Sequence, residues 1–412
     1  MSDIIVGLDL GTSAIRVVIG EFAEDNSLQI IGLGCCPSSG LRNGAIVNIE
    51  SAMHDLKKAI LDAELSSGQE VSSCITAIGG AQIESLDSRG FVAVANHGNG
   101  SREITKSDVD RVLEAATAVV IPMDRKILHV IPQQYTIDGQ AGIKDPLNNI
   151  GVRLEAAVHI ITCSVTSIQN IQRCITRAGY GVDSIMLKTL AAAQAVMTAE
   201  ELELGSILID LGGGTTDVLV VYKGAPICTA SIPVGGILVT NDIAIGKGIS
   251  FETAEQIKVK SGCCWEPSLV GADDDVIIPG VGGRAPVSVP KSDICNILQP
   301  RMRELLMLVR EQIIQKTTVR QLSGNIILVG GGAQMFGIVE LAQDVFNTEA
   351  VRIGIPSTLG SAVSEYRTPE YATAAGLLAS NIDKHAAKDY NIQKEKSFGF
   401  LSGLAKFFKD FF

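Results

Sequence analysis

Apolar residues in the first part of the chain form short continuous runs separated by a turn, and a segment with helical spacing follows them. Ile4–Leu10 and Ala14–Gly20 are β-branched apolar runs on either side of a Gly-Thr-Ser turn, and Leu28–Gly34 has the same character. In Ser51–Ser66 the apolar residues instead share one face of a helix. This alternation of strands and helices predicts an α/β fold.

One strand–turn–strand pattern occurs twice, half a chain length apart. Residues 4–19 read IIVGLDLGTSAIRVVI, and residues 207–221 read ILIDLGGGTTDVLVV. Each consists of a strand, Asp-Leu-Gly, a pair of hydroxyl residues and a second strand. Such a repeat indicates a divergent internal duplication. With alternating strands and helices in each half, it predicts two similar α/β domains that face each other.

Two segments, residues 81–158 and 243–321, interrupt the two halves. In the first we expect a helix with Thr105 as its N-cap and Asp108 at N3, a variant of the capping box. In the second, Pro300 is expected at the first position of a helix. The apolar face of that helix would consist of Met302, Leu305, Leu306, Val309 and Ile313.

The two Asp-Leu-Gly hairpins have the residues that a phosphate chain requires. Glycine lets backbone N–H groups approach phosphate, and hydroxyl side chains add further donors. Two carboxylates would repel a polyphosphate unless a cation lies between them, so we infer Mg²⁺ held largely through water. Either hairpin alone could be an ordinary turn, but two matched copies favour a phosphate site. The candidate residues are Asp9, Gly11, Thr12, Ser13, Asp210, Gly212, Gly213, Gly214, Thr215 and Thr216, with Asp9 and Asp210 facing the metal.

Two weaker signals accompany the hairpins. The run NIILVGGGAQMFGI places Gly330, Gly331 and Gly332 between a buried strand and a helix start, where N–H groups could face a ligand or simply form a tight turn. Glu255 and Lys258 lie three residues apart on an expected helix. They could hold a ribose and flank an adenine, but spacing alone favours a surface ion pair.

The last residues of the chain are unusually rich in phenylalanine. In residues 398–412 all apolar side chains fall on one half of a helical wheel, and a polar segment, residues 381–397, precedes them. This pattern is typical of a helix that lies on an anionic bilayer. A helix docked on the protein's own core, or in a partner's groove, remains an alternative. The expected membrane-binding residues are Phe400, Leu401, Leu404, Phe407, Phe408, Phe411 and Phe412.

Composition excludes several classes of protein. With 34 Lys and Arg against 45 Asp and Glu, the net charge is −11, so a nucleic-acid partner is not expected. The nine cysteines are odd in number and show no zinc-type spacing, which argues against a disulfide framework and a structural zinc site and fits a reducing cytosol. The sequence also predicts no signal peptide and no membrane-spanning helix, because the first residues lack a basic region and no apolar run reaches about 18 residues.

The paired hairpins and the Gly-Gly-Gly turn resemble the actin superfamily of ribonuclease-H-like ATPases. The first inserted segment is more discriminating. Its stretches SRGFVAVANHG, EITKSDVDRVLEAATAVVIP, DRKILHVIPQQYTIDGQAGIKDP and GVRLEAAVHIITC are similar to the FtsA family of bacterial cell-division proteins. The polar linker and the amphipathic C-terminal segment are similar as well. The resemblance covers essentially the whole chain.

The resemblance implies a duplicated ribonuclease-H-like, actin-like fold with inserted subdomains around an ATP cleft and a C-terminal amphipathic helix. The first core would comprise residues 1–80, 159–199 and 353–380, and the second core residues 200–242 and 322–352. Residues 81–158 would be the family-specific subdomain for filament and partner contacts. Residues 243–321 would form the adenosine side and the docking surface for the C-terminal peptide of FtsZ. Residues 381–396 would be the linker, and residues 397–412 the membrane-targeting helix.

The resemblance also implies roles for single residues. Glu255 and Lys258 become adenosine contacts, which reverses the preference from spacing, and Arg301 and Arg303 lie on the helix that the family uses for the FtsZ peptide. The chain departs from related ATPases in MLKTLAAAQAV, where chaperones place a carboxylate and actin a Gln, since it has Lys188 and no acid there. Ala14 stands where many relatives have a phosphate-binding Lys, and Arg16 is the nearest cation. We therefore expect ATP binding with weak or no ATPase activity.

These inferences predict a cell-division protein that binds ATP and Mg²⁺ and forms head-to-tail filaments. It would tether the FtsZ ring to anionic lipid on the cytoplasmic face of the membrane at the division site, and recruit later division proteins. A pilus-assembly protein of the same superfamily is the alternative, although such proteins normally lack this linker and helix. A small-molecule kinase is a weaker alternative, because the sequence shows no convincing catalytic carboxylate.

Overall fold

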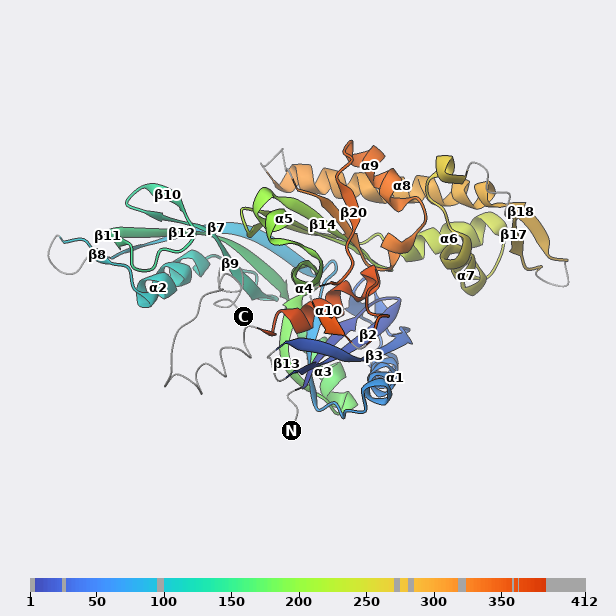
Figure 1. The fold of residues 1–412 in the computed structure, drawn as a ribbon, viewed down its shortest axis with the longest axis horizontal. Coiled ribbons are helices and arrows are strands. Elements are labelled where there is room, and N and C mark those ends of the chain that lie inside the picture. The colour runs from blue at the N-terminus through green and yellow to red at the C-terminus, as the bar shows by residue number, and fades with distance from the viewer. Residues whose placement is uncertain are drawn as a thin grey trace.

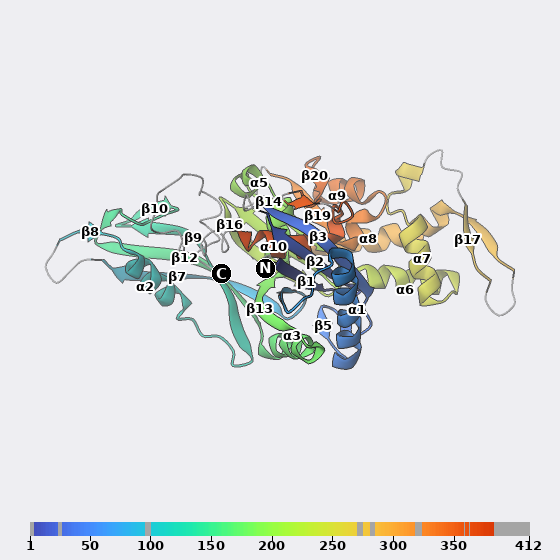
Figure 2. The ribbon, with the colours of Figure 1, turned by 60° about the horizontal axis from the view of Figure 1, so that its bottom comes forward.

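The computed structural model describes residues 4–23, 27–94, 100–269, 275–280, 285–317, 324–357, 359–361 and 363–382. Two α/β domains lie at the centre of the molecule. An inserted β-rich subdomain projects at one end of the long axis and a small β-hairpin at the other, as both ribbon views show (Figures 1 and 2).

The first domain contains a six-stranded sheet in the order β13-β6-β1-β2-β3-β21. Its strands are β1 (Ile4–Leu10), β2 (Ala14–Phe22), β3 (Leu28–Pro37), β6 (Ser73–Ile78), β13 (Gly181–Leu187) and β21 (Gly360–Ser361), and β4 (Leu41–Arg42) pairs separately with β5 (Ala45–Ile46). The helices α1 (Ile49–Ser67) and α3 (Val165–Ala178) pack on one face, and α4 (Lys188–Val196) and α10 (Ala372–Ala379) on the other. Helices on both faces explain why β1 and β2 are continuous apolar runs.

The second domain repeats this arrangement. Its five-stranded sheet has the order β16-β15-β14-β19-β20, with the same sequence of parallel and antiparallel neighbours as β3-β2-β1-β6-β13. The strands are β14 (Ser206–Leu211), β15 (Thr216–Tyr222), β16 (Ala225–Ile232), β19 (Ile326–Val329) and β20 (Val351–Ile353). The helices are α5 (Ala199–Leu204), α6 (Gly236–Lys247), α7 (Phe251–Ser261), α8 (Lys291–Lys316) and α9 (Ile338–Phe346). The predicted duplication is therefore confirmed in the topology.

Short elements complete the second half of the chain. They are the 3-10 helices η1 (Glu266–Leu269), η2 (Gly331–Gln334) and η3 (Pro369–Tyr371) and the hairpin of β17 (Asp275–Ile278) with β18 (Val287–Pro290). The core of the second domain lies between its sheet and the helices α6, α8 and α9, whereas Leu208, Leu219 and Ile327 pack into the core of the first domain. The two domains thus share a buried contact at the base of the cleft.

The inserted subdomain has a core of its own. The sheet has the order β10-β9-β12-β7 and the helix α2 packs on it, with a small separate β8–β11 pair. The elements are β7 (Ile83–Ala93), β8 (Arg102–Glu103), α2 (Lys106–Thr117), β9 (Arg125–Ile137), β10 (Gln140–Ile143), β11 (Ile150–Gly151) and β12 (Arg153–Ser164). The predicted capping box is confirmed, because Asp108 Oδ2 accepts a 2.9 Å hydrogen bond from the backbone N–H of Thr105.

The expectation that Pro300 begins a helix is wrong. The helix α8 starts at Lys291, and Pro300 lies inside it. An internal proline removes one backbone hydrogen bond and costs about 3 kcal/mol or more. The helix continues because buried side chains lie on both sides of the proline, among them Ile294 and Leu298 before it and Met302 after it. Packing of a continuous apolar face therefore outweighs the local preference.

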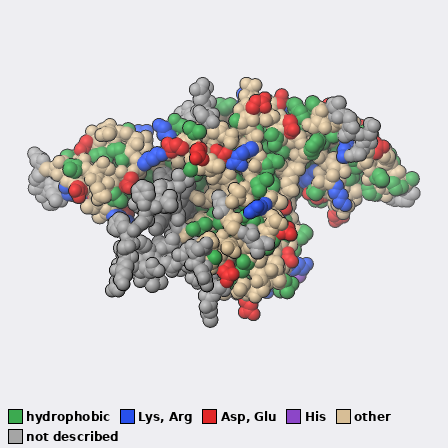
Figure 3. Space-filling view, in the orientation of Figure 1, with side chains coloured by type: hydrophobic (Ala, Val, Ile, Leu, Met, Phe, Trp, Pro, Cys, Tyr) green, Lys and Arg blue, Asp and Glu red, His purple; other side chains and the backbone are tan. Residues whose placement is uncertain are grey.

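Other sequence predictions concern the cysteines, membrane-spanning helices and the C-terminal segment. All nine cysteines are free thiols. Within the part of the chain that the structure describes, no helix is both long and apolar enough to cross a membrane. Figure 3 shows acidic and basic side chains interspersed over one face of the molecule. The linker beyond residue 382 and the whole membrane-binding segment, including Phe400 to Phe412, lie outside the described residues.

Candidate functional site

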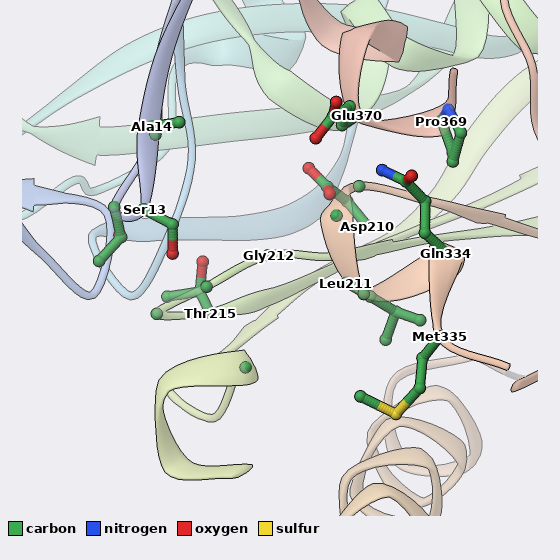
Figure 4. A pocket seen from close by; sticks show the side chains of 18 of the residues that line it. Ser13, Ala14, Asp210, Leu211, Gly212, Thr215, Gln334, Met335, Pro369 and Glu370 are labelled. Atoms are coloured by element: carbon green, nitrogen blue, oxygen red, sulfur yellow. The ribbon is translucent and has the colours of Figure 1, made fainter. Parts of the chain in front are cut away.

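The turns of the two duplicated hairpins face each other across the cleft. A Cβ atom placed on Gly213 would lie 1.9 Å from Ser13 Oγ, and one on Gly214 would lie 2.8 Å from Thr12 Oγ1. Figure 4 shows the side chains of Ser13 and Thr215 near each other on these facing turns. The glycines of the second hairpin are therefore required by the close approach of the first hairpin, as well as by any ligand.

A cavity of about 510 Å³ lies between the hairpins, within the range of about 300–1,000 Å³ that is usual for small-molecule sites. Its wall includes both Asp-Leu-Gly turns, the third glycine cluster and the helix α7. The structure thus brings together residues that are far apart in the sequence. The predicted residues that line the cavity are Asp9, Gly11, Thr12, Ser13, Asp210, Gly212, Gly213, Gly214, Thr215, Glu255, Lys258, Gly331 and Gly332.

Thr216 is the one predicted nucleotide-site residue that the structure does not place on the cavity wall. It lies at the start of β15, where successive side chains point to opposite faces. Its side chain is fully buried and its hydroxyl donates a 2.9 Å hydrogen bond to the carbonyl of Val234. The second hydroxyl of the pair therefore supports the fold rather than the cavity.

The third glycine cluster lies directly against the second hairpin. Gly330 has φ of +82°, and a Cβ atom there would lie 2.3 Å from Asp210 Oδ1, so only glycine fits. Gly331 has no atom within 4 Å of an added Cβ, so its backbone faces open space in the cavity. The cluster therefore both packs against the carboxylate strand and presents its backbone to a ligand.

Glu255 and Lys258 form the ion pair that their spacing indicates, but on the cavity wall. Lys258 Nζ lies 2.7 Å from Glu255 Oε2 and donates hydrogen bonds to Thr240 Oγ1 at 2.9 Å and to the Gly236 carbonyl at 3.1 Å. Only 13% of the Lys258 side chain is exposed. This pair is therefore fixed in place beside the second hairpin, as an adenosine contact would need to be.

The acidic residues of the two hairpins surround a single lysine. Lys188, the first residue of α4, places Nζ 2.6 Å from Asp9 Oδ1. Burial opposes the charge on Lys188, but the carboxylates of Asp9, Asp210 and Asp217 together outweigh it and raise the pKa of Lys188. Asp210 pairs directly with Asp217 across the second hairpin. Burial, reinforced by the charge of Asp217, raises the pKa of Asp210 to about 7.

Asp217 is a cavity residue that the sequence analysis missed. Its carboxylate accepts hydrogen bonds from the backbone N–H of Gly80 and from Thr215 Oγ1, both at 3.1 Å. Burial raises its pKa. The repeat contained the necessary signal, because Asp217 pairs with Asp210 at the position where Arg16 pairs with Asp9. Aligning the two copies strand by strand would have identified it.

Arg16 also reaches the cavity, as the sequence indicated, but it has a partner. It forms an ion pair with Glu370 and its guanidinium carbon lies 5.6 Å from the centre of the Tyr371 ring. Figure 4 shows that Glu370, from η3, enters the same space as Asp210. Glu370 gave no sequence signal, since it belongs to neither copy of the repeat.

The residues of this cavity fit a magnesium ion held indirectly. Asp210 and Asp217 are like charges placed opposite each other, an arrangement that is unfavourable without a counter-charge. The described residues contain no group of three or more His, Cys, Asp or Glu side chains close enough to ligate a metal directly. Mg²⁺ retains several of its waters in proteins, so Asp9, Asp210 and Asp217 can contact it through water.

The two predicted partner-binding arginines lie on α8, away from the cavity. Arg301 Nε lies 2.6 Å from Asp242 Oδ2, and its NH1 group 2.5 Å from Glu304. Arg303 pairs with Asp344 at 2.5 Å and lines a surface groove on α8. Other residues of the groove include Met307, Leu308, Arg310 and Ile314. Arg303 therefore lies on the wall of this groove, whereas Arg301 is not among the residues that line it, and both arginines are paired with carboxylates.

Comparisons with known proteins agree with one another. Family models described as "Cell division protein FtsA" and "SHS2 domain inserted in FTSA" match residues 207–376 and 80–162. The chain is 40% identical to cell division protein FtsA of Pseudomonas aeruginosa over 382 residues, which cover 93% of this chain and 90% of that protein. It is 36% identical to the FtsA of Bacillus subtilis over 396 residues, or 96% of this chain and 86% of that protein.

Solved structures of actin-like proteins share the fold. The type IV pilus biogenesis complex of PilM and PilN aligns with a TM-score of 0.66 at 16% identity, covering 92% of this chain and 98% of that one. MreB5 of Spiroplasma citri, solved with AMPPNP, aligns with a TM-score of 0.56 at 17% identity, covering 95% and 99%. At such identities these likenesses establish the architecture alone.

Proposed function

The chain belongs to the FtsA family of bacterial cell division proteins, and from that premise we propose that it binds Mg²⁺·ATP between its domains, assembles into filaments and tethers the FtsZ ring to the membrane. It is a division-site protein with an actin-like, nucleotide-binding fold. The observation that carries the proposal is the pair of duplicated hairpins that face each other across a cavity of about 510 Å³.

The nucleotide would span the cavity from the hairpins to α7. Backbone N–H groups of the hairpin turns, with the hydroxyls of Thr12, Ser13 and Thr215, supply donors for the phosphates. Lys258 and Glu255 flank the adenosine end. Magnesium, when bound, supplies the positive charge that offsets the phosphates and the carboxylates. The residues of this chain then position the phosphate chain and exclude water from it.

Hydrolysis is expected to be slow or absent. The start of α4 carries Lys188, and a protonated lysine is a hydrogen-bond donor that cannot accept a proton from an attacking water. The Asp217 carboxylate accepts hydrogen bonds from Gly80 and Thr215, which fix its position, so we do not expect it to activate an attacking water instead. ATP would therefore act mainly as a ligand that holds the two domains together and favours head-to-tail filaments.

The α8 groove is the proposed docking site for the C-terminal peptide of FtsZ. Arg303 and Arg310 offer positive charge beside the exposed apolar side chains of Met307 and Ile314. An acidic amphipathic peptide complements such a surface. The inserted subdomain would contribute to filament contacts and bind later division proteins.

Membrane attachment is assigned to the C-terminal segment around Phe407, Phe408 and Phe411. One amphipathic helix binds an anionic surface reversibly, but a filament presents many helices, and each further attachment is effectively intramolecular. Because ATP promotes filaments, it should strengthen membrane binding at the cytoplasmic face without contacting the tail. Curated relatives named FtsA over most of the chain weigh against the pilus-assembly alternative.

The test is calorimetric titration of the full chain with Mg²⁺·ATP. Asp210→Ala should abolish binding while the circular dichroism spectrum and melting behaviour remain those of a folded protein. Asp110→Ala, a matched change of an exposed aspartate on α2, should leave the affinity unchanged. Wild-type affinity in the Asp210→Ala protein would refute the assignment of the cavity.

A further inference from the structure

Lys188 is held deep in the cavity by an arrangement that serves no evident packing purpose. Its Nζ donates a 3.1 Å hydrogen bond to the Leu10 carbonyl, in addition to the 2.6 Å contact with Asp9, and only 12% of its side chain is exposed. The stem passes Gly79 at the end of β6, where an added Cβ would lie 2.9 Å from Lys188 Cδ. The ammonium group is therefore fixed between the first hairpin and the cavity.

The charges around the cavity make this lysine unusual. Asp9, Asp210 and Asp217 contribute three carboxylates on the side of the hairpins. Three other cations line the wall: Arg16 is paired with Glu370, Lys258 is paired with Glu255, and Lys260 is an exposed residue in the last turn of α7. Lys188 is thus the cation that offsets the aspartate cluster. Among the described residues, no other Lys or Arg forms an ion pair with Asp9, Asp210 or Asp217, so without Lys188 an anionic phosphate chain would meet three carboxylates with no cation in direct contact with them.

We propose that Lys188 is a positioning residue for the phosphate chain, a fixed cation that lets the cavity accept a nucleotide with a reduced requirement for a divalent metal. The inference rests on the proposed nucleotide site and adds to it a determinant of metal dependence. Because the lysine comes from the chain itself, its charge is present whether or not magnesium is bound.

Removal of this charge should have two effects of opposite sign. In Lys188→Met the aspartate cluster becomes more negative by one charge, so ATP without metal is repelled more strongly. The same change should make the metal alone bind more tightly, since three carboxylates then face it without competition from an ammonium group. Local disruption of the fold would weaken both kinds of binding, so the opposite signs distinguish the two explanations.

The experiment measures three affinities of the full chain by calorimetry: ATP with Mg²⁺, ATP in excess EDTA, and Mn²⁺ without nucleotide. In Lys188→Met we expect the ratio of the ATP dissociation constant in EDTA to that with Mg²⁺ to rise at least about tenfold, and the Mn²⁺ affinity to increase. Lys188→Arg should keep the wild-type ratio. The matched control Lys258→Met should weaken ATP binding by a similar factor in both conditions.

An unchanged ratio in Lys188→Met, with ATP still bound, would overturn the inference and leave the nucleotide site intact. A loss of both ATP and Mn²⁺ binding would also overturn it, in favour of a purely structural lysine, provided that Lys188→Gln behaves in the same way. Failure of the wild-type protein to bind ATP under either condition would refute the proposed function and this inference together.

Discussion

The carboxylate of Asp210 should destabilise the nucleotide-free protein at neutral and alkaline pH. Its pKa is raised from 3.8 to about 7 by burial and by Asp217. A carboxyl group with a raised pKa in the folded state penalises folding above that pKa, and the penalty vanishes as the pH falls below the unfolded value. The difference between 3.8 and about 7 corresponds to about 4 kcal/mol at 1.36 kcal/mol for each pKa unit.

Asp210→Asn removes this charge while conserving shape. Because the amide is itself a buried polar group with a cost of its own, we expect a net gain of about 2 kcal/mol above pH 7. The variant should therefore melt at a higher temperature than the wild type near pH 8, in EDTA and without nucleotide. The advantage should vanish near about pH 5, where the penalty on the wild-type carboxylate has fallen to about 2 kcal/mol, and reverse at lower pH.

Thermal melts over this pH series, followed by circular dichroism, provide the measurement, and Mg²⁺·ATP titration of the same protein should show lost binding. Asp110→Asn is the matched control, because that side chain is exposed on α2 and should give no pH-dependent change. A variant that is less stable than the wild type at about pH 8, or equally stabilised at about pH 5, would contradict the electrostatic reasoning.

Three further predictions concern other parts of the molecule. Asp108→Asn should destabilise the inserted subdomain by about 1–3 kcal/mol, because hydrogen bonds to the Asp108 carboxylate, above all from Arg102, hold its pKa low. Hydrogen exchange of α2 should be faster in the variant than in the wild type, and this difference should shrink as the pH falls. Arg303→Glu should weaken binding of an acidic FtsZ tail peptide in fluorescence anisotropy, because it reverses a charge on the wall of the α8 groove, whereas Arg177→Glu, on the helix α3, should not; equal affinities would move the docking site. Phe408→Glu should prevent pelleting with anionic liposomes in the presence of ATP and Phe408→Leu should not; pelleting of both would show that the tail is not the anchor.

The framework of the fold could be predicted because the hairpins follow local rules. An apolar run, a short turn and a second apolar run together predict β1 and β2. The same pattern half a chain later predicts β14 and β15. The register is the same in both copies, since Leu10 pairs with Ile15 and Leu211 with Thr216. Two copies with equal turns imply sheets of equal topology, and the structure has them.

The features that sequence reasoning missed depend on long-range contacts. Pro300 is tolerated inside α8 because the helix buries an apolar face on both sides of it. Thr216 belongs to a hydroxyl pair in the sequence, but the pleat of β15 turns it toward Val234. Lys188 was noted only because its segment contains no acidic residue, and its contact with Asp9 depends on how α4 meets β1. None of these outcomes is encoded in a local pattern of spacing.

Divergence between the two copies accounts for the chemistry of the cleft. At equivalent positions the first hairpin pairs Asp9 with Arg16, and the second pairs Asp210 with Asp217. The first copy is therefore electrically balanced, whereas the second has an excess of negative charge. The compensating cation, Lys188, acts on both Asp210 and Asp217 and belongs to the first domain. We therefore expect attraction across the cleft to favour closure, and a metal bound there would strengthen this attraction by adding positive charge between the two halves.

The same closure must involve the inserted subdomain. Its strands continue from β6 and lead into α3, so the chain connects it to the first domain. His159 on β12 nevertheless contacts Asp87 at 2.7 Å through Nδ1 and Thr229 of β16 at 3.0 Å through Nε2, and Gln133 reaches the Pro226 carbonyl at 3.1 Å. Since the bonds to Thr229 and Pro226 cross to the second domain, a change in the angle between the domains has to break them or rotate the insert. We therefore expect occupancy of the cleft to be coupled to the orientation of the inserted subdomain, the proposed surface for filament contacts.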